Sequence, residues 1–205
     1  MEVRSLGLRP YVEVWELQRE LVGRRQRGEI PDTLLLCEHE PVYTRGEASK
    51  APVPPSLPHP IHTVERGGDI TYHGPGQLVG YPILDLASRG LRPRSYLRAI
   101  EASLRDCLTP LGVRADTIRG FTGLWCGGRK IASIGVAVKG AISYHGFSIN
   151  VRCDLTAFAA IHPCNLQPDQ MTTLERVLGR PVTVSEVERA VAAGFAALGR
   201  APQPA

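Results

Sequence analysis

The run over residues 66–83, with the sequence R-G-G-D-I-T-Y-H-G-P-G-Q-L-V-G-Y-P-I, constrains the fold more than any other part of the chain. Gly67-Gly68 allows a positive φ or a close approach of the backbone to a ligand. Pro75-Gly76 suits the two central positions of a type II turn. Between these points, strand alternation places Thr71 and His73 on one face. The run predicts short strands around tight turns. Its residues alone fit a glycine-rich hairpin with a solvated histidine as well as a ligand site.

Alternating and apolar segments elsewhere predict further strands, with helices towards both ends of the chain. Strands are expected at 3–8, 33–37, 61–64, 69–73 and 78–84, with a strand meander over 123–151. Helices are expected over 10–28 and 94–108, and the capping boxes Thr172-x-x-Glu175 and Thr183-x-x-Glu186 predict two more. Five prolines over 48–60 predict a surface loop or a lid. We expect one α/β or α+β domain over 1–205, with a mixed, largely antiparallel sheet flanked by helices and a disordered tail over 201–205.

Composition and charge exclude several classes of protein. Hydrophobic residues make up 43% of the chain and charged residues 21%, as in ordinary globular proteins. The apolar runs are too short to span a bilayer, and no secretory pattern is visible, so a cytoplasmic protein is expected. The net charge of +4 favours an acidic partner but is too weak to indicate nucleic acid binding. The densest basic stretch, a candidate surface for such a partner, contains Arg89, Arg92, Arg94 and Arg98.

The five cysteines are an odd number and contain no C-x-x-C pair, so neither a disulfide framework nor a cysteine-rich zinc site is expected. Cys37 and Cys107 fall in apolar elements and are expected to be buried. Cys126 borders a predicted hairpin turn, and Cys153 follows a strand. Cys164 lies in a loop between helical segments, where chemistry is often carried. The residues alone leave Cys164 and Cys126 as the candidate nucleophiles.

Lys130 has an unusual position in a chain that contains only three lysines among 24 basic residues. It follows the hairpin signal Gly127-Gly128. Alternation along the next strand places it on the face of Ala132, Ile134 and Val136. An ammonium on an apolar face is costly unless it has a partner or a task. Lys130 therefore either reaches water from the strand end or takes part in chemistry.

Four motifs resemble those of the lipoyl(octanoyl) transferases. The run over 66–83 resembles R-G-G-x-x-T-x-H-x-P-G-Q-x-x-x-Y-P-I, and Lys130 lies in a match to G-x-K-I-A-x-I-G. Residues 145–151 resemble H-G-x-x-x-N-V. Pro163-Cys164, followed by M-T-T-L over 171–174, resembles a P-C-G loop ahead of an M-T-[ST]-L helix. Asn165 departs from the glycine of that loop, although asparagine also tolerates a positive φ.

The resemblance extends from about Leu6 to the helix after Thr183, and it implies the fold shared by the catalytic domains of biotin and lipoate ligases. It implies that Cys164 is the nucleophile and that the Lys130 ammonium lowers the pKa of its thiol. It implies an acyl pocket made by Arg66, Gly67, Gly68, Asp69, Ile70, Thr71, Tyr72, His73, Ser133, Ile134, Gly135, Gly146, Phe147 and Ser148. A glycine in a strand leaves room for a ligand, so Gly135 and Gly146 are expected to open a groove for the acyl chain. Plain sheet packing is the alternative for the residues of these two strands.

The implied reaction takes an octanoyl group from acyl carrier protein, holds it on the cysteine as a thioester, and passes it to a lysine. The implied acceptors are lipoyl domains of 2-oxoacid dehydrogenase complexes and the glycine cleavage H protein. No cofactor is required, and the sequence contains no apparent metal-ligand set. The alternatives are an ATP-dependent lipoate or biotin ligase of the same fold and a non-catalytic acyl-binding protein.

Overall fold

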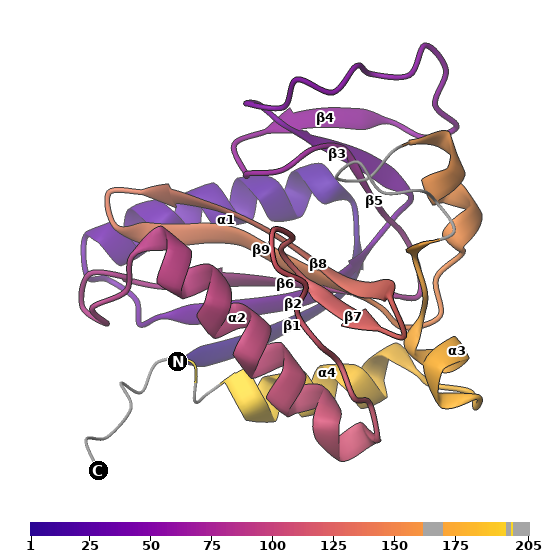
Figure 1. The fold of residues 1–205 in the computed structure, drawn as a ribbon. Helices are drawn as coiled ribbons and strands as arrows, with labels where there is room; N and C mark the ends of the chain where they lie inside the picture. The colour runs from indigo at the N-terminus through magenta and orange to yellow at the C-terminus, as the bar shows by residue number, and fades with distance from the viewer. Residues whose placement is uncertain (162–169, 196–197, 199–205) are drawn as a thin grey trace.

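A six-stranded sheet forms the centre of the molecule (Figure 1). The structure, a computed structural model, describes residues 1–161, 170–195 and 198. In spatial order the strands are β1 (Glu2–Arg9), β2 (Thr33–His39), β6 (Gln77–Ile83), β9 (Ile142–Asn150), β8 (Arg129–Lys139) and β7 (Leu124–Cys126). In this sheet β1 and β2 pair in parallel, and the other neighbouring strands are antiparallel. The mixed, largely antiparallel sheet expected from the sequence is confirmed.

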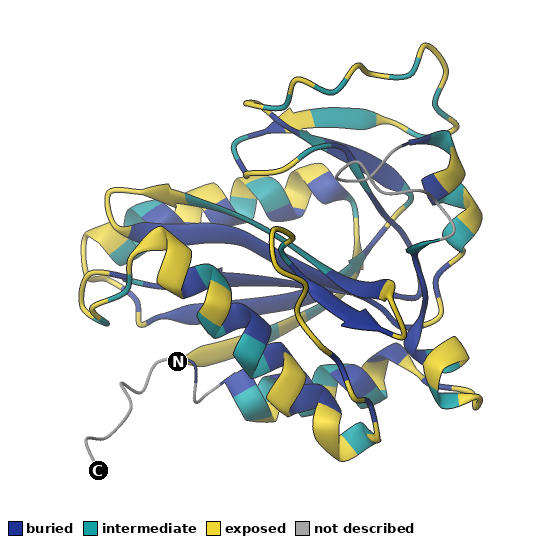
Figure 2. Ribbon diagram, viewed as in Figure 1, coloured by how far each residue is buried: buried dark blue, intermediate teal, exposed yellow. Residues whose placement is uncertain are grey.

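Helices cover both faces of the sheet (Figure 1). α1 (Tyr11–Gln26) packs on one face, and α2 (Pro93–Leu108) and α4 (Val184–Phe195) pack together on the other. The packing of β2 explains its apolar run over 34–37: Leu34 and Leu36 face α2 and α4, whereas Leu35 and Cys37 face α1. A strand covered on both faces has no solvent side, and β9 is likewise buried along its whole length (Figure 2). No helix in the described part of the chain has the length and apolar character needed to cross a membrane.

A second, three-stranded sheet lies beside the first. It contains β4 (Ile61–Val64), β3 (Val42–Gly46) and β5 (Thr71–His73), in that spatial order. Tyr43 and Tyr72 of this sheet pack against Phe158 of the 3-10 helix η2 (Leu155–Ala160). The proline-rich segment 48–60 has no helix or strand, as its composition predicts. A second 3-10 helix, η1 (Thr109–Leu111), follows α2.

The turn predictions are confirmed, and two element boundaries need correction. Gly76 has a φ of 83°, and the Gln77 amide donates to the Gly74 carbonyl at 3.1 Å, as a type II turn requires. The strand expected at 69–73 begins only at residue 71. The helix expected after Thr172 is α3 (Leu174–Leu178), and its cap is Thr173 instead, whose hydroxyl accepts from the Arg176 amide at 3.2 Å.

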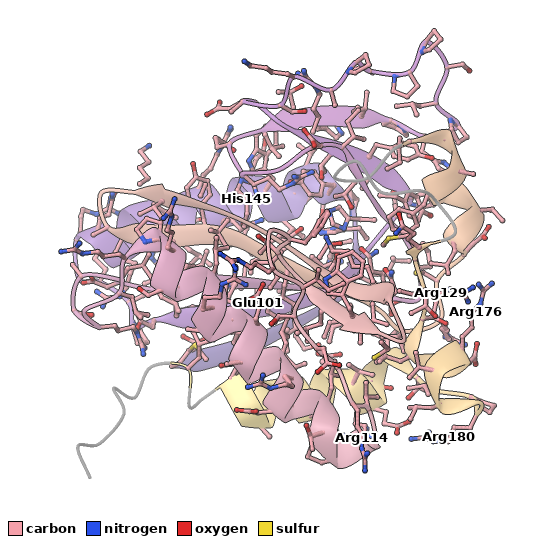
Figure 3. All side chains as sticks on the ribbon, in the orientation of Figure 1. Glu101, Arg114, Arg129, His145, Arg176 and Arg180 are labelled. Atoms are coloured by element: carbon pink, nitrogen blue, oxygen red, sulfur yellow. The ribbon has the colours of Figure 1, made fainter. Side chains whose placement is uncertain are left out.

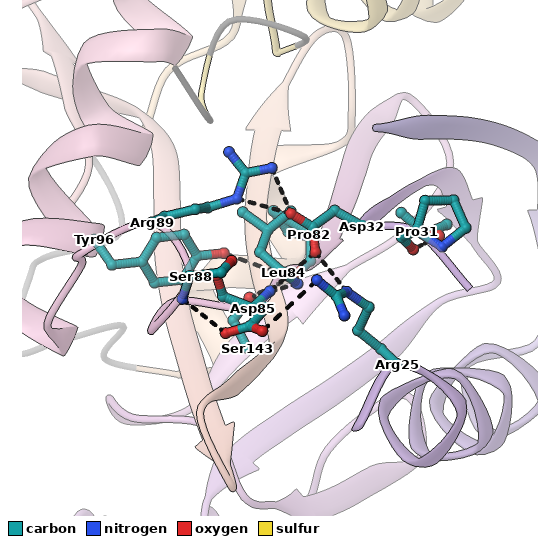
Figure 4. Close-up of polar contacts among 11 residues, drawn as sticks. Arg25, Pro31, Asp32, Pro82, Leu84, Asp85, Ser88, Arg89, Tyr96 and Ser143 are labelled. Carbon is teal, nitrogen blue, oxygen red and sulfur yellow. Dashed lines mark hydrogen bonds and ion pairs between the residues drawn. The ribbon is translucent and has the colours of Figure 1, made fainter. Parts of the chain in front are cut away.

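A buried carboxylate joins three connections at the end of the sheet where β2 begins and β6 ends (Figure 4). Asp32 accepts from Arg25 Nε at 2.8 Å, from Arg89 Nε at 2.7 Å and from the Asp85 amide at 3.0 Å. Burial alone would raise the pKa of Asp32, but these hydrogen bonds hold it below its ordinary value. The end of α1, the start of β2 and the segment after β6 are thereby held together, and Arg89 has a structural role.

Candidate functional site

A cavity opens where the glycine-rich loop at 66–69 meets β5, β6, β8 and β9. It is lined by Tyr11, Arg66, Gly67, Gly68, Asp69, Thr71, His73, Val79, Tyr81, Lys130, Ser133, Ile134, Gly135, His145, Gly146, Phe147 and Ser148. The three sequence segments implied by the family resemblance therefore meet around one space.

Three residues implied at the site are not among those that line the cavity. Ile70 and Tyr72 pack instead into the cluster of Tyr43 and Phe158, on the opposite side of β5 from Thr71 and His73. This placement follows the alternation expected along β5. Cys164 lies outside the described residues.

Four lining residues were missed by the sequence reasoning. Tyr11 opens α1, and Val79 and Tyr81 lie on the α1 side of β6, away from Leu78. Alternation in β6 could have separated these two from Leu78, but it could not have shown that their side borders a cavity. His145 carries a better signal, because it opens the H-G-x-x-x-N-V motif.

Lys130 is buried, with 3% of its surface exposed, and it lines the cavity. Its ammonium lies 5.4 Å from the centre of the Trp125 ring, its cross-strand neighbour on β7. The expectation that Lys130 shares a face with Ala132 is wrong. Leu124 pairs with Ala132 and Trp125 with Lys130, so β8 contains one extra residue, a β-bulge at Ile131. Ile131 and Ala132 therefore both enter the apolar core, and Lys130 joins Ser133 at the cavity.

The main chain of Lys130 is also bonded to the segment that follows Cys164 in sequence. Lys130 and Met171 form a parallel bridge, and the Thr172 amide donates to the Lys130 carbonyl at 3.0 Å. Ile161, which precedes Cys164, packs in the same cluster as Met171. The described residues on both sides of the candidate nucleophile thus converge beside the Lys130 wall of the cavity.

The glycines of β8 and β9 do not open the groove expected of them. A Cβ on Gly135 would lie 2.8 Å from the Gly67 carbonyl oxygen, and one on Gly146 would lie 2.2 Å from the Gly80 carbonyl oxygen. Both spaces are already filled by backbone. The groove hypothesis is therefore wrong for these two positions, because each glycine permits a close approach of neighbouring chain. The approach at Gly135 is held by a hydrogen bond from the Gly67 amide to the Val136 carbonyl at 3.0 Å.

Arg66 anchors the glycine-rich loop to the small sheet. Its guanidinium donates to the Thr44 carbonyl at 2.6 Å, to the Thr44 hydroxyl at 2.9 Å and to the Gly67 carbonyl at 3.0 Å. Since the side chain is buried and also lines the cavity, it fixes the loop against β3 while placing a positive charge at the site.

His73 is held in place by a chain of buried amides. The Gln77 side-chain nitrogen donates to Asn150 Oδ1 at 2.9 Å, so Gln77 Oε1 must accept from His73 Nδ1, 2.6 Å away. Asn150 in turn donates to the Thr172 carbonyl at 3.2 Å. Burial lowers the pKa of His73 to about 3. The chain connects the imidazole to the same segment that bonds to Lys130.

His145 of β9 is held by a carboxylate and lies beside α1 (Figure 3), where its amide donates to Gln18 Oε1 at 2.8 Å. It has a positive φ of 53°, an uncommon conformation for a residue with a side chain. Its Nε2 lies 3.2 Å from Glu65 Oε2, and Glu65 also accepts from Trp15 at 2.9 Å and from Arg19 at 2.7 Å. Burial lowers the pKa of His145 to about 4. Burial would raise the pKa of Glu65, but hydrogen bonds led by those of Arg19 lower it to about 2.

The described cysteines are poor nucleophiles. Burial raises the thiol pKa of Cys107 to about 11 and of Cys153 to about 12, and it raises those of Cys37 and Cys126 as well. Cys126, the rival of Cys164, donates to the Arg114 carbonyl at 3.2 Å and does not line the cavity. The structure therefore offers no support for Cys126 as the nucleophile.

Sequence comparisons with known proteins all indicate the same family. The profile of the lipoyl protein ligase A/B catalytic domain matches residues 10–196. An octanoyltransferase of Geobacter sulfurreducens is 47% identical over 201 residues, which cover 97% of this chain and 84% of that protein. An octanoyltransferase of Mycobacterium tuberculosis is 46% identical over 200 residues, with 96% and 86% covered.

Solved structures of more distant proteins share the fold. A lipoate-protein ligase A bound with ATP superposes with a TM-score of 0.75 at 17% identity, over 97% of this chain and 85% of that one. A biotin protein ligase of Aquifex aeolicus gives 0.57 at 12% identity, over 97% and 68%. These two superpositions show only that the fold is shared. The family is shown by the matches in sequence. The chain belongs to the octanoyltransferases, within the lipoyl protein ligase A/B catalytic domain family.

Proposed function

We propose that the cavity holds the octanoyl chain and that Cys164 carries it as a thioester between donor and acceptor. Octanoyl transfer in protein lipoylation is the activity of the family, and the chain is accordingly an acyltransferase. The proposed donor is an octanoyl acyl carrier protein. The proposed acceptors are lysines on lipoyl domains of 2-oxoacid dehydrogenase complexes and on the glycine cleavage H protein.

The observation that carries this proposal is the buried Lys130 ammonium, whose own backbone is bonded to the segment after Cys164. Ile161 precedes Cys164 by three residues in the sequence, a span of at most about 11 Å. Ile161 itself packs with Met171, which forms a bridge to Lys130. An ammonium within about 4–6 Å of a thiol lowers its pKa by a unit or more. Lys130 is the cavity residue that supplies such a charge on the side nearest these flanking residues.

In the first half-reaction the Cys164 thiolate attacks the thioester carbonyl of the donor. A bond forms between Cys164 Sγ and the acyl carbon, and the bond to the sulfur of the carrier breaks. The departing carrier thiolate takes a proton from the Lys130 ammonium, which leaves Lys130 as a neutral amine. One thioester replaces another, so this step is nearly balanced in free energy.

In the second half-reaction the neutral amine of an acceptor lysine attacks the acyl carbon. An amide forms, the bond to Cys164 Sγ breaks, and the amine proton passes to Lys130. The thiolate and the ammonium are thereby restored. Conversion of a thioester to an amide is downhill, so the cycle requires no ATP.

The proposal is tested by incubating the protein with octanoyl acyl carrier protein in the absence of ATP. Intact mass spectrometry with peptide mapping should reveal one octanoyl adduct, on Cys164, which is lost when a lipoyl domain is added. Cys164→Ala should form no adduct, whereas Cys126→Ala should form it at the wild-type rate. An adduct on Cys126, or one that forms only with ATP, would contradict the proposed mechanism.

A further inference from the structure

A hollow on the outer surface lies between the β7–β8 turn and α3. It is lined by Cys126, Gly127, Arg129, Thr172, Arg176 and Val177. Arg129 and Arg176 come from segments far apart in the sequence, and Figure 3 labels both at the same edge of the molecule. Both side chains are exposed, and Val177 is an exposed apolar residue beside them.

The hollow and the cavity share one piece of backbone. Thr172 borders the hollow, Lys130 lines the cavity, and the Thr172 amide donates to the Lys130 carbonyl. Arg129 immediately precedes Lys130 in β8. A molecule bound in the hollow would therefore lie directly outside the wall of the cavity that carries the ammonium.

Several arginines of the described surface are neutralised by a carboxylate, whereas the two arginines of the hollow are not. Arg19 pairs with Glu65, Arg98 with Glu101, and Arg180 with Glu186. Among the described residues, no carboxylate lies within ion-pair distance of Arg129 or Arg176. Arg176 attracts Asp154 only at longer range. The pKa of Asp154 is held below its ordinary value chiefly by hydrogen bonds from the Thr156 amide and hydroxyl. The hollow therefore presents uncompensated positive charge.

The arginine stretch over 89–98 is less suited to an anionic partner. Arg89 is engaged by Asp32 and Arg98 by Glu101, so half of that basic cluster is neutralised within the fold. Arg129 and Arg176, in contrast, present guanidinium groups whose planar geometry suits phosphate and carboxylate oxygens.

We propose that this hollow is the docking surface for the acidic acyl carrier protein that donates the octanoyl group. A phosphate or carboxylate of the carrier binds Arg129 and Arg176, and Val177 supplies apolar contact. This inference rests on the proposed function, because it assumes that the donor is an acyl carrier. It assigns the surface to the donor and not to the lipoyl domain that accepts the group.

The test compares two donors in the first half-reaction. One is octanoyl acyl carrier protein, and the other is octanoyl-N-acetylcysteamine, a small neutral thioester without phosphate or protein. In the double variant Arg129→Glu/Arg176→Glu, the kcat/KM for acylation by the carrier should fall about 10- to 100-fold. Acylation by the neutral thioester should stay within about twofold of wild type, because neither arginine lines the cavity.

Matched variants sharpen the result. Arg9→Glu makes the same change of charge on an exposed residue of β1, at the opposite edge of the sheet from β7, and should leave both donors unaffected. Arg129→Lys/Arg176→Lys keeps the charge and should recover most of the activity with the carrier. Added salt should slow the carrier reaction of the wild-type protein and have little effect on the double Glu variant.

Three outcomes would overturn the inference. An equal loss with both donors would mean that the arginines support the fold or Lys130. A loss confined to Arg94→Glu would place the donor on α2. A loss only in transfer from acylated protein to the lipoyl domain would assign the hollow to the acceptor. If neither donor acylates the wild-type protein, the proposed function itself fails and this inference with it.

Discussion

Two kinds of polar group line the cavity, and they are held in different ways. His73 and His145 are each fixed by a hydrogen bond to a defined acceptor, Gln77 for one and Glu65 for the other, and burial keeps both imidazoles neutral near pH 7. Lys130 lies over the face of Trp125, on a strand displaced by a bulge. From this comparison we expect a division of roles. The histidines give the walls a fixed shape, and the proposed role of Lys130 is to supply the charge for the chemistry.

The largest effect is expected at Lys130. Lys130→Met keeps an unbranched stem but removes the charge, so the cavity should keep its shape while the transfer rate falls by at least ~100-fold. The thiol pKa of Cys164 should rise as well. Single-turnover acylation and the pH dependence of alkylation provide the measurements.

Lys130→Arg separates the two steps assigned to this residue. Arginine keeps the charge, so acylation should survive, but it does not readily release a proton, so transfer to the acceptor should fail. If the alkylation profile of Lys130→Met overlays that of the wild type, the division of roles is wrong.

The next largest effect is expected in the amide chain that holds His73. Gln77→Met keeps the length of the side chain but leaves His73 Nδ1 and Asn150 Oδ1 without their partner. The free energy of unfolding should fall by about 2–3 kcal/mol, since buried polar groups are left unsatisfied. The matched control is Gln26→Met, where the glutamine bond to the Lys139 carbonyl is exposed, and where the loss should stay below about 0.5 kcal/mol. Equal losses in urea titrations would show that the buried chain contributes no more than a surface contact.

The carboxylate that holds His145 predicts a dependence on pH. The pKa of Glu65 falls from the ordinary 4.5 to about 2 on folding, so its ionised form stabilises the fold above about pH 4.5. The full shift corresponds to about 3 kcal/mol, and partial exposure to solvent reduces this to roughly 1–2 kcal/mol. Glu65→Gln should therefore be less stable than wild type by that amount at pH 7. The difference should disappear as the pH falls from about 4.5 towards 2. A difference that does not change with pH would indicate lost packing and not lost charge.

The smallest effect is expected where the backbone of β8 contacts the glycine-rich loop. Gly135→Ala places a methyl group 2.8 Å from the Gly67 carbonyl oxygen, so the glycine-rich loop must shift at a cost of about 1 kcal/mol. Gly67→Ala is the control, because its new Cβ would have no neighbour closer than 3.9 Å. Thermal unfolding should show a lower Tm for Gly135→Ala alone. Equal Tm values would mean that the loop is not held as tightly as its geometry indicates.

Local chemistry allowed much of this fold to be predicted. Turn residues fixed the positions of Gly76 and of the Gly127-Gly128 hairpin, and the apolar run after Thr33 indicated a fully buried strand. The alternation along β5 correctly separated Thr71 and His73 from Ile70 and Tyr72. Each of these features depends on a few neighbouring residues, which is why the sequence alone reveals it.

Features that depend on the partner strand could not be predicted. The bulge at Ile131 exists because β7 pairs with β8 in a shifted register, and nothing within β8 indicates it. The spaces beside Gly135 and Gly146 are filled by residues 67 and 80, which are distant in sequence. The tie between Glu65 and His145 likewise joins residues 80 positions apart. Such contacts are decided by tertiary packing and not by local pattern.

The bulge in β8 sets which residues stand beside Lys130 at the cavity. Cross-strand partners share a face of a sheet, so Lys130 lies on the face of Trp125, and Ala132 lies on the opposite face with Leu124. A lysine moved by two positions, the repeat of a regular strand, would therefore point into the apolar core. A charge without a partner there would cost several kcal/mol. The cation cannot be moved along this strand by the ordinary two-residue step, and its place beside Ser133 depends on the pairing with β7.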